Sequence, residues 1–238
     1  MKGREHVNSS DDIKRSVSRT YDNIAPHFAP TRENVWPPTM ELIRYRSPCI
    51  IGDLGCGTGR ALVEAASRGC SVIGIDSSGG QLEMARSALI KTGLIGSARL
   101  YVADMEDVPL NDRELDICLM IASLHHLPDA DSRRSALNEA YRITKPGGIL
   151  QVSVWTWDQE RFRRRHLDRL HGRRSTDDDD GQATGDFLVP WKKGTNAMRF
   201  YHLYGPGELE REIRSSRWTL QRSFFDGRNH WAECIRGP

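Results

Sequence analysis

The sequence lacks the features of membrane and secreted proteins. No run of apolar residues approaches the length of a membrane span, and 28% of the 238 residues are charged. Residues 1–6 have no signal-peptide core. We therefore expect a cytoplasmic protein that does not bind a membrane.

Cysteine is present, but not in a pattern typical of disulfides or zinc. The five cysteines are an odd number, and none has Cys-x-x-Cys spacing. Cys49 and Cys118 fall in expected strands and Cys56 in a glycine turn. This predicts reduced, buried thiols and no metal site in the chain.

Lysine is scarce, and arginine greatly outnumbers it. The formal net charge is nevertheless only +2. The arginines cluster between residues 161 and 174. A planar guanidinium suits phosphate, whereas the alternative is a solvated helix face. We expect Arg163, Arg164 and Arg165 to contact a nucleic acid.

A glycine-rich turn between two acids is the most informative feature. An apolar strand ends near an acid, three alternate glycines follow, and a second apolar run ends in another acid: Asp53, Gly55, Gly57, Gly59 and Asp76. Glycines let the backbone approach a ligand closely, and the next helix start turns amides toward it.

The spacing of this turn favours S-adenosylmethionine over a nicotinamide dinucleotide. Arg60 stands where the dinucleotide pattern needs its third glycine. Asp53 would repel a pyrophosphate but suits a cationic amino group, and Asp76 suits a ribose. The sequence therefore predicts S-adenosylmethionine as the cofactor.

Apolar strands alternate with helical segments, which predicts an α/β fold with a parallel sheet. The expected strands are 49–54, 71–76, 98–103, 115–121 and 148–155, and the expected helices lie near 58–68, 79–92 and 130–143. A stop-and-turn is expected at 145–148.

The segments on either side of this core differ from it in sequence pattern. Ser9 and Asp12 belong to a helix start whose helix runs to about Ile24, and 218–225 with 230–235 predict a closing antiparallel hairpin. We expect residues 1–47 to form a helical cap and substrate segment. Residues 48–238 form the main domain, with a substrate-binding insertion at about 158–205.

Residues 48–156 resemble class I S-adenosylmethionine-dependent methyltransferases through the acid–glycine turn, Asp76, Asp104-Met105 and residues 123–128. The resemblance implies a Rossmann-like, seven-stranded, mostly parallel sheet of order 3-2-1-4-5-7-6. It also implies that Asp104 and Met105 flank the adenine. The implied cofactor residues are Tyr21, Asp53, Gly55, Cys56, Gly57, Asp76, Ser77, Asp104, Met105 and Ile121.

The flanks resemble a narrower family. Residues 21–28, Thr31-Arg32, Trp36-Pro37, 189–191 and 199–204 are similar to the signatures of tRNA wobble-uridine carboxymethyl methyltransferases, including the methyltransferase half of the AlkB-homologue tRNA enzymes. The resemblance implies methyl transfer to the carboxylate of 5-carboxymethyluridine in the tRNA anticodon loop. It also implies a small zinc-binding activator protein as partner. The acidic insert 177–180 departs from the signature.

A carboxylate acceptor would determine the residues that the site needs. It is already ionised at neutral pH and requires no general base, so the protein has to position it. Arg32 and Arg199 are the expected catalytic cations, and Trp36 and Tyr201 could stack on a splayed-out base. Further expected substrate contacts are Trp191 and His202. The alternative for these aromatic residues is core packing.

His125 follows the fourth strand, where ligands of open α/β sheets bind. It could contact the substrate carboxylate or cap the loop. If the acceptor were a hydroxyl, an amine or a carbon acid, His125 would become the candidate general base.

The third strand, Ala98–Val102, should form an edge of the sheet. Its neighbours Ile90, Leu94 and Ile95 are apolar where exposure is expected. We expect the zinc-binding partner to form a heterodimer by adding a strand here.

Two other functions stay open from the residues alone. One is a methyltransferase for a small molecule, such as a quinone precursor or a carboxylic acid. The other is a binding module that keeps the fold without the chemistry. The arginine cluster and the flanking signatures argue against the first, and the acids Asp53, Asp76 and Asp104 argue against the second.

Overall fold

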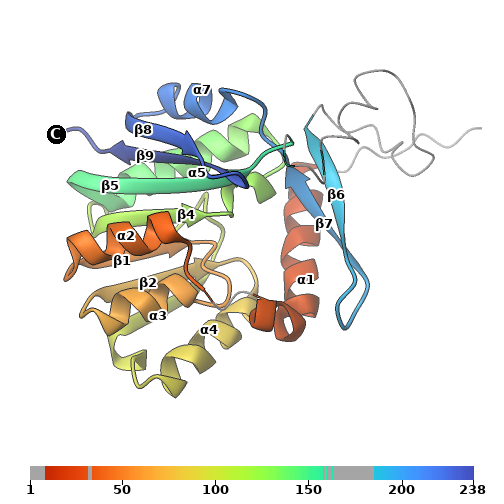
Figure 1. Cartoon of the computed structure of the whole chain (residues 1–238), viewed down its shortest axis with the longest axis horizontal. Helices are drawn as coiled ribbons and strands as arrows, with labels where there is room; N and C mark the ends of the chain where they lie inside the picture. The colour runs from red at the N-terminus through yellow and green to blue at the C-terminus, as the bar shows by residue number, and fades with distance from the viewer. Residues whose placement is uncertain (1–8, 32–33, 158, 160–161, 163–184) are drawn as a thin grey trace, which may run out of the picture.

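A seven-stranded sheet runs through the centre of the molecule, with helices on both faces (Figure 1). The structure is a computed structural model that describes residues 9–31, 34–157, 159, 162 and 185–238. Within this part of the chain, every helix is too short or too polar to cross a membrane.

The order of the strands is β3-β2-β1-β4-β5-β9-β8, and the last two pairings, β5 with β9 and β9 with β8, are antiparallel. This confirms the expected order 3-2-1-4-5-7-6. In chain order the strands are β1 Ile50–Leu54, β2 Ser71–Asp76, β3 Ala98–Val102, β4 Leu115–Ile121, β5 Thr144–Trp155, β8 Thr219–Phe225 and β9 Asn229–Ile235.

Each face of the sheet is covered by its own helices. The bounds are α2 Pro37–Arg46, α3 Arg60–Ser67 and α4 Gly79–Lys91 on one face, and α5 Ala130–Ile143 and α7 Glu208–Arg214 on the other. Ala61, Leu62, Ala65 and Ala66 form the buried stripe of α3 at the i, i+1, i+4, i+5 spacing of a helix. Because both faces are covered, the central strands are mostly apolar.

The fifth strand begins earlier than expected. Thr144 pairs with Leu115, and the pairing resumes between Ile149 and Ile117, so the ladder contains a bulge. Gly147 lies in this bulge with a φ of 75°. The expected turn at 145–148 is therefore an irregularity inside a strand, because a bulge absorbs the extra residues without ending the pairing.

The N-terminal helix α1, Ser10–Phe28, lies across the carboxyl ends of the strands and packs on α4. Ser9 and Asp12 form a reciprocal capping box at its start, as expected. The helix continues past the predicted end at Ile24 and through Pro26. Ile24 and Ala25 are buried, and Phe28 packs on Tyr21 at 5.5 Å between ring centres. Packing therefore outweighs the cost of the proline.

A second, two-stranded antiparallel sheet pairs β6, Asp186–Trp191, with β7, Ala197–His202. The sequence analysis predicted this segment only as part of a substrate-binding insertion at about 158–205. Along β6 the buried residues Phe187, Val189 and Trp191 alternate with exposed ones. This hairpin packs on α1, so it extends the wall above the ends of the strands. The bounds of the remaining elements are η1 Ala29–Thr31, η2 Ile95–Ser97 and η3 Leu124–His126.

Candidate cofactor and acceptor site

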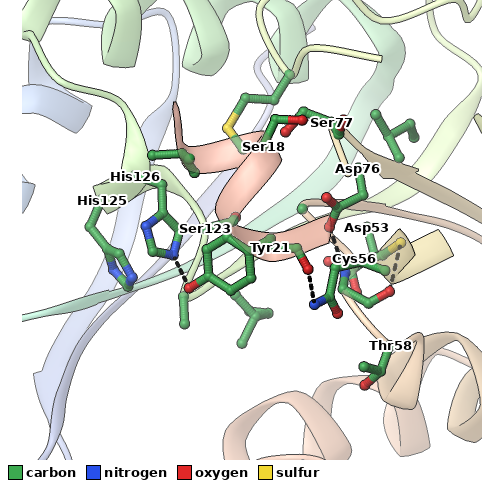
Figure 2. A pocket seen from close by; sticks show the side chains of 18 of the residues that line it. Ser18, Tyr21, Asp53, Cys56, Thr58, Asp76, Ser77, Ser123, His125 and His126 are labelled. Carbon is green, nitrogen blue, oxygen red and sulfur yellow. Dashed lines mark hydrogen bonds between the residues drawn. The ribbon is translucent and has the colours of Figure 1, made fainter. Parts of the chain in front are cut away.

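A cavity of about 280 Å³ opens at the carboxyl ends of β1, β2 and β4, beneath α1 (Figure 2). Its lining includes every residue expected to bind the cofactor: Tyr21, Asp53, Gly55, Cys56, Gly57, Asp76, Ser77, Asp104, Met105 and Ile121. Thus one pocket contains residues from the glycine turn, from the ends of three strands and from the N-terminal helix.

The three glycines of the turn have positive φ angles of 79°, 53° and 76°. A Cβ at Gly55 would lie 2.4 Å from Ser123 Cβ, and one at Gly59 would lie 2.7 Å from Ala85 Cβ. At Gly57 the nearest atom would be Gln81 Oε1, at 3.7 Å. Gly55 and Gly59 therefore allow close packing, whereas Gly57 leaves space for a ligand.

Asp76 holds the turn against the second strand. Its carboxylate accepts hydrogen bonds from the backbone amides of Gly57, at 2.8 Å, and Ser78, at 2.9 Å. Burial raises the pKa of Asp76 to about 6, against the lowering effect of these two amides. An acid fixed at the end of the second strand is positioned to accept from a ribose.

Asp53 is only 4% exposed, and its Oδ1 has no hydrogen-bond partner among the described residues. Burial raises its pKa to about 7; Arg60 opposes this shift and Asp76 adds to it. A buried carboxylate of this kind favours a cationic ligand group, which would restore its ordinary acidity.

Helix α1 is attached to the cofactor side of the pocket by polar contacts. Ser18 donates to the Ser77 carbonyl at 2.8 Å, and Asp22 accepts from the Ser78 hydroxyl at 2.7 Å and the Gly80 amide at 2.9 Å. Lys14 pairs with Glu106 at 2.7 Å and lies 3.8 Å from Asp104. The helix is thus a cover over the site.

The other end of the pocket contains a chain of hydrogen bonds between aromatic residues. Arg199 donates to the Tyr201 hydroxyl at 3.0 Å, which lies 3.2 Å from the Tyr21 hydroxyl. Tyr21 donates to His126 Nε2 at 3.0 Å, and His126 Nδ1 donates to the Phe200 carbonyl at 2.9 Å. Burial lowers the pKa of His126 to about 4, so this ring is neutral at pH 7.

His125 is fully buried and stacks on Tyr201 at 5.0 Å between ring centres. Its Nδ1 accepts the Trp155 backbone amide at 3.1 Å. In the neutral ring the proton must therefore be on Nε2, which makes Nε2 a donor. As oriented, His125 suits an anionic acceptor and does not suit the role of a general base.

Residues 52–152 match the family model described as a methyltransferase domain. The chain is 36% identical over 156 residues to a tRNA (carboxymethyluridine(34)-5-O)-methyltransferase of Arabidopsis thaliana, covering 65% of this chain and 36% of that protein. It is 30% identical over 182 residues to the mouse enzyme of the same activity, ALKBH8, covering 74% of this chain and 26% of that protein.

The chain contains a methyltransferase domain of the S-adenosylmethionine-dependent kind. It spans 36% and 26% of the length of the two relatives. Among solved structures, a Burkholderia thailandensis 1,6-didemethyltoxoflavin-N1-methyltransferase shares the fold with a TM-score of 0.70 and 14% identity, over 99% of this chain and 94% of its own. The methyltransferase domain, together with the intact acids, favours an enzyme over a non-catalytic module.

Some of the expected substrate residues line the methyltransferase pocket, and others do not. Trp36, Tyr201 and His125 line it. Trp36 is half-buried beneath the Arg60 guanidinium, which lies 4.7 Å from the ring centre. Arg199 and Trp191 are buried in the wall behind Tyr201 and do not line the pocket.

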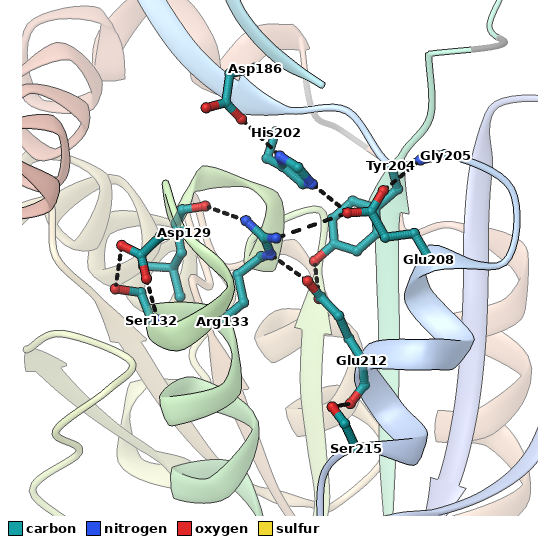
Figure 3. A network of polar contacts seen from close by, with 11 residues as sticks. Asp129, Ser132, Arg133, Asp186, His202, Tyr204, Gly205, Glu208, Glu212 and Ser215 are labelled. Carbon is teal, nitrogen blue, oxygen red and sulfur yellow. Dashed lines mark hydrogen bonds and ion pairs between the residues drawn. The ribbon is translucent and has the colours of Figure 1, made fainter. Parts of the chain in front are cut away.

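His202 belongs to a polar network that joins three elements (Figure 3). Its ring lies between Asp186 of β6 and Glu208 of α7, each at 2.8 Å. Arg133 of α5 pairs with Glu212 of α7 at 2.7 Å. The network anchors the β6–β7 hairpin to α7, so the described contacts of His202 are architectural.

Arg32, Arg163, Arg164 and Arg165 lie outside the described residues, as does the acidic insert 177–180. Their expected contacts with substrate therefore stay predictions. Conversely, the sequence interpretation missed Gln81, Ser123 and His126 as pocket residues. Proximity to the end of β4 could have indicated Ser123 and His126.

The raised pKa of Asp53 predicts a pH dependence of cofactor affinity. A cationic amino group binds the carboxylate form, so affinity should fall as the pH falls through about 7. Asp53→Asn should weaken binding about 10- to 100-fold at pH 8, the range expected for a hydrogen bond to a charged group. Calorimetric titration from pH 6 to 8.5 measures both effects.

The Asp53→Asn variant is also the control for that titration. Its affinity should be nearly constant between pH 7 and 8.5, and the dependence that remains near pH 6 belongs to Asp76. An identical pH profile in the variant and the native protein would contradict this assignment of Asp53.

The His202 network predicts a second pH effect, on stability. Burial alone would lower the pKa of His202, but Asp186 and Glu208 outweigh it and raise that pKa. Because the folded pKa is raised, the stabilisation is complete below about pH 6.5 and is lost as the pH rises through the folded value. His202→Gln should cost ~1.5–3 kcal/mol at pH 6 and less at pH 9.

Urea unfolding of the native protein and the variant at both pH values measures that difference. Equal losses of unfolding free energy at pH 6 and pH 9 would mean that the charged His202 imidazolium does not contribute to stability.

Proposed function

We propose that this methyltransferase acts on tRNA and esterifies the carboxylate of 5-carboxymethyluridine at the wobble position. The observation that carries the proposal is the orientation of His125. Its Nδ1 is occupied by the Trp155 amide, so its Nε2 can only donate. The names of the Arabidopsis and mouse relatives support the same acceptor.

The residues at the acceptor end suit a nucleophile that is already charged. When bound, S-adenosylmethionine supplies an electrophilic methyl group. The His125 Nε2–H and the Tyr201 hydroxyl are the donors that would orient a carboxylate, which loses no proton on methylation. Arg199 acts through Tyr201, to which it donates at 3.0 Å.

Trp155 and Tyr201 form an aromatic wall beside these donors. Their rings are stacked 4.5 Å apart at an angle of 11°, and both line the pocket. The edges and faces of such a wall fit a splayed-out base better than a flexible aliphatic acid. Arg32 and Arg163–Arg165 complete the proposal as phosphate or carboxylate contacts. The free cysteines fit a cytoplasmic location.

The direct test is the chemistry of the product. The protein, with a zinc-binding partner from the same cell, is incubated with methyl-labelled S-adenosylmethionine and with tRNA that carries the free acid. We expect label in tRNA that mild alkali removes, because esters hydrolyse and N-, C- and ribose-methyl groups do not. A His125→Leu variant, which removes the donor, should lose at least about tenfold in rate.

Three outcomes would contradict the proposal. Alkali-stable label would mean another acceptor group. Label in small molecules of a cell extract, but not in tRNA, would favour the small-molecule alternative. Full activity of His125→Leu would remove the observation on which the proposal rests.

We also propose that the activator binds the β3 edge of the sheet. Ala98–Val102 pairs only with β2 among the described strands. On this edge strand Val102 is 66% exposed, and on α4 Ile90 is 58% exposed. Leu100, in contrast, packs against β2. A Cβ added at Gly74 would lie only 2.8 Å from Leu100 Cδ2. An open edge with exposed apolar side chains suits a partner that adds a strand.

The partner test uses the two exposed side chains. The double variant Ile90→Arg, Val102→Arg should lose copurification with a coexpressed zinc-binding activator, while its melting temperature stays within a few degrees of native. Tyr45→Arg is the matched control, because Tyr45 is 79% exposed on α2. Unchanged copurification of the double variant would rule out this edge.

A further inference from the structure

Gln81, near the start of α4, is a second buried acceptor in the cofactor pocket. The residue is 1% exposed and lines the pocket, yet its Oε1 has no hydrogen-bond partner among the described residues. Leaving a buried acceptor unsatisfied costs on the order of 1–3 kcal/mol. A donor on the bound ligand would remove that cost.

The orientation of the amide is fixed by the protein. Its Nε2 donates to the Tyr21 carbonyl at 3.3 Å. The reverse orientation would place two oxygen acceptors against each other. The Gln81 backbone amide donates to the Ser78 hydroxyl at 3.1 Å, which secures this turn of α4. Oε1 therefore remains available to a ligand.

The surroundings of Oε1 indicate which part of the cofactor it meets. It lies 3.7 Å from the position of a Cβ at Gly57, the one glycine of the turn that leaves space for a ligand. The Gly57 amide donates to Asp76 at 2.8 Å. Gln81 Oε1 and the Asp76 carboxylate therefore flank the same glycine, at the end where a ribose is expected.

We propose that Gln81 accepts a hydrogen bond from a ribose hydroxyl of the cofactor, beside Asp76. Through its Nε2 the same amide holds Tyr21, whose hydroxyl donates to His126 in the acceptor network. Gln81 thus links cofactor binding to α1 and to the acceptor end of the pocket. The inference concerns the cofactor site and is independent of which acceptor the enzyme methylates.

Calorimetric binding of two ligands separates the ribose from the amino-acid end. S-adenosylhomocysteine contains both ends, whereas 5′-methylthioadenosine contains the ribose and adenine but no amino group. Gln81→Met, which is similar in volume, should weaken both ligands by the same factor, about 3- to 10-fold. Asp53→Asn is the control and should weaken only S-adenosylhomocysteine.

Ribose-modified ligands refine the test. The titration is repeated with the 2′-deoxy and 3′-deoxy forms of 5′-methylthioadenosine. One of these forms should bind the native protein more weakly than 5′-methylthioadenosine does. The Gln81→Met variant should bind that same form at least as tightly as it binds 5′-methylthioadenosine. If the methionine variant does not fold, Gln81→Asn serves, because it keeps an amide but withdraws it from the pocket.

Two results would overturn the inference. If Gln81→Met weakens S-adenosylhomocysteine alone, Gln81 contacts the amino-acid end. If neither ligand is affected while the melting temperature falls, Gln81 only supports α1.

Discussion

The rest of the structure depends on two desolvated carboxylates beneath a glycine turn, the buried Asp53 and the half-buried Asp76. Asp53 and Asp76 lie at the ends of adjacent parallel strands, and burial raises the pKa of each. Neither would be stable as an anion without compensation. Asp76 receives two backbone amides, whereas Asp53 depends mainly on the nearby Arg60 charge. The site therefore favours a ligand that brings a cationic group to Asp53 and a hydroxyl donor to Asp76.

The other parts of the site surround these two acids. Helix α1 covers the acids, and its Tyr21 points toward the acceptor end, where it meets His126. The β6–β7 hairpin supplies Tyr201 to the same end of the pocket and is anchored through His202 to α7. Thus elements far apart in the sequence meet over the ends of the strands. The pocket then has hydrogen-bond acceptors at the end that suits the cofactor. It has hydrogen-bond donors at the end that suits the group to be methylated.

The sheet and the cofactor site could be predicted from the sequence, because their signals are local. Apolar runs ending in Asp53 and Asp76 determine both the strands and the turn between them. The hairpin was harder, because Pro190 lies within β6 and hides a strand whose buried residues nevertheless alternate. The partners of His202 were hidden for a related reason. Its partners, Asp186 and Glu208, come together only after the hairpin and α7 have folded.

Gln81 illustrates what no local pattern could indicate. In the sequence it is an ordinary polar residue of an amphipathic helix. Only the approach of α1 buries it, fixes its amide against the Tyr21 carbonyl and leaves its oxygen in the pocket. The orientation of His125 is equally non-local, because it depends on the amide of Trp155 at the end of another strand.

The central claim is that the enzyme positions an acceptor that is already ionised and removes no proton from it. The most direct measurement is the single-turnover rate of methyl transfer to tRNA, at saturating cofactor, between pH 6 and 9. The proposed function predicts a rate that is nearly independent of pH, because a carboxylate acceptor would be ionised throughout and His126, with a pKa of about 4, stays neutral. A rate that falls tenfold per pH unit below about pH 7 would show that a base must be deprotonated, and it would contradict the account.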